Sequence, residues 1–110
     1  MLSDNMAEYF RRGHLGERNA ADAKELIDTF DASEREMWNT VNTLRRSGVP
    51  IASSTRGYFY AATAQEVRTT ITRMSHRIID IARAIDGLNE SLGAFDAAQT
   101  GTPPDGGGGP

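Results

Sequence analysis

The side chains best suited to recognise another molecule lie together in the stretch Ser33–Gly48. Apolar residues recur there at i, i+4 and i+7, which predicts a helix with one face buried and the other exposed. Arginine and asparagine on an exposed helical face can form paired hydrogen bonds with the major-groove edges of guanine and adenine. The outward-facing candidates for contact with DNA are Arg35, Trp38, Asn39 and Asn42, followed at the end of the helix by Arg45 and Arg46.

Three of these candidates have an alternative role that the sequence leaves open. Trp38, the only tryptophan, adjoins the apolar stripe, and we expect it to pack against the following hairpin or the last helix rather than against DNA. Arg45 and Arg46 would complement the helix dipole as well as a phosphate. Arg56 lies in the turn of the predicted hairpin and has no buried role there. It is therefore the strongest candidate for a phosphate or minor-groove contact.

Catalytic and metal chemistry find no support in the residue types and spacings. No nucleophile, base and orienting group form a recognisable arrangement, so we expect no enzyme and no cofactor. No effector-binding domain is recognisable either, so no small-molecule ligand is expected. The chain has no cysteine, and its two histidines stand outside any metal-ligand spacing, so no metal site is expected. His14 is expected in a solvated loop and His76 on a face of a long helix.

Three helices and a hairpin should position the candidate residues within a domain comprising residues 1–62. The second helix is expected to start with Asn19 as its N-cap, and Ser33 with Glu36 forms a complete capping box for the third. The buried stripe of the third helix is expected to comprise Met37, Val41 and Leu44. The segment 50–61 has the pattern of a hairpin. This order is typical of a winged helix-turn-helix domain, so the predicted fold class is mainly α with a small β-hairpin wing.

A long helix is predicted next, over residues 63–98, from a capping pattern at Thr63 and Glu66. Its apolar residues alternate spacings of four and three, which indicates a coiled-coil seam. The seam comprises Val67, Ile71, Met74, Ile78, Ile81, Ile85, Leu88, Leu92 and Phe95. About 33 residues at ~1.5 Å each span roughly 50 Å, more than the preceding domain can cover, so we expect self-association. A homodimer is favoured over a tetramer, and residues 99–110 are expected to form a disordered tail rich in glycine and proline.

Charge is unevenly distributed along the chain. The formal net charge is −3, but residues 33–83 hold eight arginines against four acids, a local excess of +4. This excess falls on the third helix, the hairpin and the first half of the last helix, as a phosphate footprint would. No apolar run reaches the length of a membrane span, so we expect a cytoplasmic protein with no membrane partner.

The segment Ser33–Ile51, followed by Gly57-Tyr58, resembles the type-11 helix-turn-helix family, the winged domains of biotin-repressor-like bacterial regulators. The shared features are a Ser-capped helix ending in Leu-Arg, a glycine, an Ile-bearing strand and Gly-Tyr in the returning strand. The resemblance covers about residues 19–61. It implies sequence-specific DNA binding through the helix that begins at Ser33, with basic residues such as Arg35 early in that helix.

The whole chain is also similar to small phage-encoded winged-helix proteins, in residues 23–26, in residues 57–63 and in the long last helix. That similarity implies a viral or prophage origin, with the cytoplasm of a bacterial host as the location. The resulting prediction is a homo-oligomeric protein that binds double-stranded DNA and regulates transcription. Two alternatives stay open: a winged-helix module that binds another protein, favoured by the acidic net charge and Glu34, and an accessory DNA-binding protein of phage replication or packaging.

Overall fold

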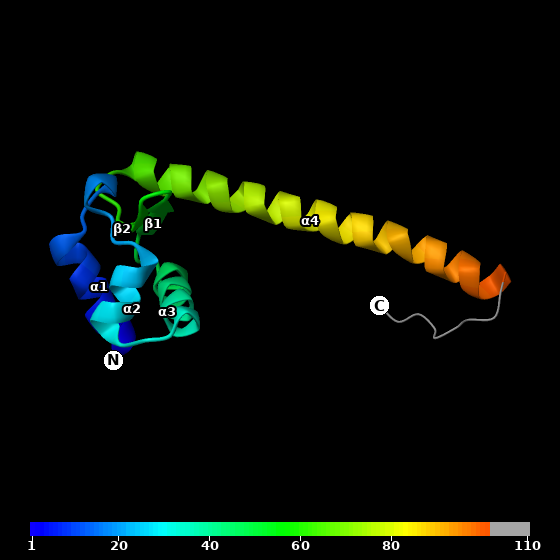
Figure 1. Cartoon of the computed structure of the whole chain (residues 1–110). Helices are drawn as coiled ribbons and strands as arrows, with labels where there is room; N and C mark the ends of the chain where they lie inside the picture. Colours follow the sequence, from blue (N-terminus) through cyan, green and yellow to red (C-terminus); the bar gives the residue numbers. More distant parts are fainter. Residues whose placement is uncertain (102–110) are drawn as a thin grey trace. The chain divides into compact units, whose positions relative to one another are not determined.

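The computed structural model describes residues 1–101 and divides into two units, one comprising Met1–Thr72 and the other beginning at Arg73. The elements of the first unit are α1 (Leu2–Gly13), the short 3-10 helix η1 (Glu17–Asn19), α2 (Ala23–Phe30), α3 (Glu34–Arg46), β1 (Ile51–Ser54) and β2 (Gly57–Tyr60). Helix α4 (Ala64–Gly101) begins in the first unit and continues as the second (Figure 1). The expected mainly helical chain with a small hairpin and a long C-terminal helix is confirmed. Helix α4 passes the predicted end at residue 98, and the remainder of the predicted tail, residues 102–110, lies outside the described residues.

The core of the first unit is formed by the apolar faces of its three α-helices and by β1. Side chains from all four elements are buried: Met6, Phe10, Leu26, Met37, Val41, Leu44 and Ile51. The stripe expected to face inward on α3 is therefore confirmed. Since α3 buries one face against α1, α2 and β1, its opposite face stays open to solvent.

Helix α2 starts later than the sequence predicts. The expected N-cap at Asn19 is wrong, because residues 17–19 form η1 and the chain is then extended up to Asp22. The side chain of Asp22 caps α2 by accepting a hydrogen bond of 2.8 Å from the backbone N–H of Glu25. A short turn then leads to Ser33, whose capping box with Glu36 is confirmed by hydrogen bonds of 3.1 and 2.9 Å.

Strand β2 is hydrogen-bonded along both edges. On one edge it pairs antiparallel with β1, in a register that places Ser54 opposite Gly57 and leaves Thr55 and Arg56 as the turn. On the other edge, Ala21 and Tyr58 exchange two backbone hydrogen bonds of 2.8 Å each. The segment before α2 thus holds the hairpin in place, which was not predicted from the sequence.

Gly57 lies where the segment before α2 comes closest to the hairpin. Its φ is +131°, and a Cβ at this position would lie 2.3 Å from the carbonyl oxygen of Ala21. Gly57→Ala is therefore expected to lower the free energy of unfolding by about 3 kcal/mol, through backbone strain and the clash together. Urea denaturation would measure the loss. Gly13→Ala is the matched control, since nothing lies within 4 Å of its Cβ, and an equal loss there would contradict the explanation.

The first turns of α4 are tied to the rest of the first unit by two side chains. The carboxylate of Glu66 accepts hydrogen bonds from the backbone N–H groups of Glu17 (3.0 Å) and Ala62 (2.7 Å), which lower its pKa. At the capping box expected for Thr63, the Glu66 N–H donates to the Thr63 hydroxyl (3.2 Å), and the Glu66 carboxylate also accepts from the neighbouring Ala62. The buried hydroxyl of Thr70 accepts a hydrogen bond from the backbone N–H of Ser53.

The remainder of α4 is one uninterrupted helix through Gly101. Its large apolar side chains from Met74 to Phe95 are exposed. Among the described residues, no helix combines the length and the apolar character that a membrane span requires.

Candidate nucleic-acid interface

The exposed face of α3 carries the side chains predicted to contact DNA. Arg35, Asn39 and Arg46 are exposed and Asn42 is half-buried, at spacings of four, three and four residues. These spacings place the four side chains on one face of the helix, opposite the buried stripe. Hydrogen-bonding groups for both bases and phosphates are therefore gathered on one surface.

Trp38 stands beside this face, next to the hairpin. The residue was expected to pack against the hairpin or the last helix; it lines a groove together with Tyr58 of the hairpin, and 54% of it is exposed. It lies one position past the buried Met37, which turns its ring toward the edge of the helix instead of the core. An open groove of about 490 Å³ runs past the ring and is lined by Ala23, Glu34, Arg35, Met37, Trp38, Asn39 and Tyr58.

Tyr58 is a groove residue that was not predicted from the sequence, whereas Glu34 was expected on the exposed side of the helix. A signal for Tyr58 exists in the alternation along β2, since Phe59 is buried and its neighbours must point to the opposite side of the strand. Glu34 places a carboxylate at the N-terminal end of the same groove.

Arg45 connects α3 to the hairpin. Its Nε donates to the carbonyl oxygen of Ile51 (2.8 Å), its Nη2 donates to the hydroxyl of Ser53 (3.2 Å), and its guanidinium lies 5.9 Å from the ring centroid of Tyr58. These contacts with the hairpin are a structural role that was not among the two predicted for this residue. Arg46 is exposed, and its Nη2 donates to the hydroxyl of Thr43 (3.2 Å).

Arg56 occupies the tip of the hairpin. The turn is held by a hydrogen bond from its backbone N–H to the hydroxyl of Ser54 (3.1 Å), while its side chain is exposed. Because α3 and β1 pack together and Arg45 bonds to β1, the hairpin that carries the tip is attached directly to α3.

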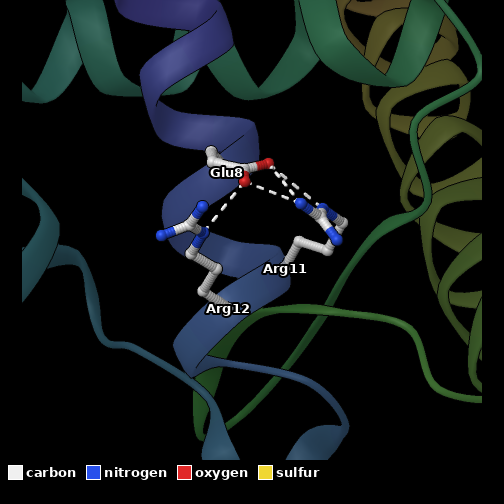
Figure 2. Close-up of polar contacts among 3 residues, drawn as sticks. All are labelled: Glu8, Arg11 and Arg12. Carbon is white, nitrogen blue, oxygen red and sulfur yellow. Dashed lines mark hydrogen bonds and ion pairs between the residues drawn. The ribbon is translucent and has the colours of Figure 1, made fainter.

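Three other basic side chains of the first unit, those of Arg11, Arg12 and Lys24, are paired with neighbouring carboxylates. Figure 2 shows the carboxylate of Glu8 between the guanidiniums of Arg11 and Arg12, at 2.6 and 2.9 Å. The hydrogen bonds from both arginines lower the pKa of Glu8. Lys24 is likewise 3.0 Å from Asp28. These three side chains are therefore less available to an anionic partner than the exposed arginines of α3 and the hairpin tip.

His14 is not the solvated loop residue that was expected. Its side chain is only 15% exposed, its ring centroid lies 4.7 Å from that of Tyr9, and its Nδ1 is 2.6 Å from the carbonyl oxygen of Asn19. Its Nε2 is 3.3 Å from a carboxylate oxygen of Glu25, which also accepts a hydrogen bond from the Tyr9 hydroxyl. Burial raises the pKa of Tyr9, and the hydrogen bond from its hydroxyl to Glu25 raises it further. The cluster joins the end of α1 to α2.

No group of three or more histidine, aspartate or glutamate side chains that could hold a metal ion occurs within residues 1–101. The candidate site is thus a polar and aromatic surface with arginines at its edges. Comparison of the chain with protein-family models, curated proteins and solved structures gives no match.

Proposed function

We propose that the protein binds double-stranded DNA in the manner of a winged helix-turn-helix domain, with α3 as the recognition helix. The observation that carries the proposal is the gathering of Arg35, Asn39, Asn42 and Arg46 on the one face of α3 that the core leaves exposed. A helix with this face in the major groove would present amide and guanidinium groups to base edges.

The hairpin would contact the DNA backbone beside that groove. Arg56 at its tip supplies an exposed positive charge, and phosphate contacts of this kind fix the position of a recognition helix without reading sequence. Arg45 supports the arrangement indirectly, since its hydrogen bonds to Ile51 and Ser53 hold the hairpin against α3.

The protein would act as a homo-oligomer joined by α4, with a transcriptional regulator as the favoured role. The apolar residues of α4 that face solvent supply the surface for association. Two copies would engage paired half-sites, and the two-fold symmetry of the protein would be matched in its target.

Fluorescence of Trp38 tests the proposal directly. This tryptophan is the only one in the chain and shares a groove with Arg35 and Asn39, so bound DNA should change its emission. We expect a saturable change on titration with a mixed-sequence duplex. If three exposed arginines per copy each neutralise one phosphate, the affinity should fall roughly 40-fold per copy between about 50 and about 200 mM salt. A flat signal at both salt concentrations would contradict DNA binding.

The groove favours a second candidate function, the binding of another protein. Trp38, Met37 and Tyr58 offer it an aromatic and apolar lining, and Glu34 adds a negative charge that a phosphate backbone would oppose. Aromatic residues and methionine are enriched at protein interfaces. Contact with DNA that is weak and insensitive to salt would favour this second function over the first.

A further inference from the structure

Helix α4 carries an apolar stripe that is exposed over seven turns. The exposed members are Ile71, Met74, Ile78, Ile81, Ile85, Leu88, Leu92 and Phe95. Exposed apolar surface of this extent marks an interaction site. Since the stripe repeats every 3.5 residues, it stays on one side only when the helix supercoils around a helix with the same repeat. Every copy of the chain carries that repeat, so a second copy is the occupant that fits.

We propose that α4 pairs antiparallel with α4 of a second copy, with Ile81 of one opposite Ile85 of the other. The proposal rests on the homo-oligomer of the proposed function and adds its orientation and register. The core pairs across the two copies are Ile71 with Phe95, Met74 with Leu92, Ile78 with Leu88, and Ile81 with Ile85. No apolar residue between Ile71 and Phe95 on the stripe is left without a counterpart in this register.

The charges along α4 select the antiparallel orientation. Residues 66–83 hold four arginines against Glu66 and Asp80, a net charge of +2. Residues 84–98 hold three acids and no basic residue, a net charge of −3. A parallel pair would place the two net basic halves together and the two acidic halves together, whereas an antiparallel pair places the basic half of each helix beside the acidic half of the other. The two helix dipoles also oppose each other in the antiparallel pair, which is favourable.

Burial at the two ends of the stripe selects the register. Val67, at the N-terminal end, is already half-buried within the first unit, whereas Phe95 is 52% exposed. A register shifted by one heptad would pair Val67 again and leave Phe95 in water. The proposed register covers Phe95 instead, and it also places Arg68 beside Asp96 of the second copy at positions flanking the stripe.

Introduced cysteines can show whether the two α4 helices are parallel or antiparallel, because the natural chain has no cysteine. Full-length Ile78→Cys and Leu88→Cys proteins, one of them tagged, are mixed under reducing conditions and then oxidised. We expect a disulfide-linked heterodimer from the mixture and no linked homodimer from either protein alone. In a homodimer of either variant the two cysteines would lie about 15 Å apart along the axis, well beyond the ~7 Å between Cα atoms that a disulfide allows.

A second pair keeps the test valid if cysteine in the stripe weakens the association. Ser75→Cys and Asn89→Cys change exposed residues flanking the stripe, and a short bis-maleimide should join them only in the mixture. Linked homodimers of the Ile78→Cys or Leu88→Cys protein would indicate a parallel pair. That result would overturn the antiparallel orientation but not the proposed self-association. A monomer mass for the unmodified protein in light scattering would overturn the oligomer as well. Neither readout depends on DNA binding.

Discussion

Ile78→Asp is expected to convert the protein into monomers. Ile78 is 67% exposed in the single chain, so a carboxylate there should disturb the fold of one copy very little. In a paired α4 the same carboxylate would be buried among apolar side chains in both copies, at a cost of several kcal/mol for each charge. If the unmodified dimer has a dissociation constant in the micromolar range or weaker, this cost should leave Ile78→Asp entirely monomeric at the concentrations used for measurement.

Light scattering measures the outcome as a mass, with 12.0 kDa for one chain and twice that value for a dimer. Ile79→Asp is the matched control. It makes the same change at the adjacent isoleucine, which is also exposed but lies outside the alternating stripe. We expect Ile79→Asp to keep the mass of the unmodified protein. An unchanged mass for Ile78→Asp would defeat the assignment of the stripe as the surface of association.

Arg56→Ala is expected to weaken binding to all DNA sequences by about tenfold at low salt and to reduce the slope of log affinity against log salt by about 0.9 per copy. The reason is that a side chain at the hairpin tip would meet phosphate, which is the same at every base pair. Duplex titrations at several salt concentrations, with two or more unrelated sequences, would measure both quantities.

Arg12→Ala serves as the control for the general loss of one positive charge. Its guanidinium is exposed but already bonded to Glu8, so its removal should leave the affinity and the slope unchanged. A changed base preference without loss of affinity in Arg56→Ala would contradict the phosphate role. Equal losses in the two variants would indicate a diffuse electrostatic effect instead of a contact at the tip.

Features set by neighbouring residues were predictable from the sequence. The capping box of Ser33 and Glu36, the buried stripe of α3 and the hairpin after it each depend on residues a few positions apart. Helical periodicity and side-chain capping are local signals, so a single sequence reveals them. The same periodicity predicted which side chains of α3 would be exposed.

Features set by distant residues were not predictable in this way. Asn19 has the chemistry of an N-cap, but the bonds between Ala21 and Tyr58 keep the chain extended there and move the cap to Asp22. The carboxylate of Glu66 similarly finds a partner 49 residues away, at Glu17. Such pairings depend on the assembled fold, which local patterns do not encode.

The bonds from Arg45 to the hairpin have a consequence for the speed and entropy of recognition. A hairpin joined to α3 only by backbone would sample many positions and would lose that freedom on binding. Because Arg45 fixes β1 against α3 in the free protein, much of this conformational entropy is already lost before a partner arrives. The surface is therefore preorganised, and association should need no slow rearrangement of the hairpin.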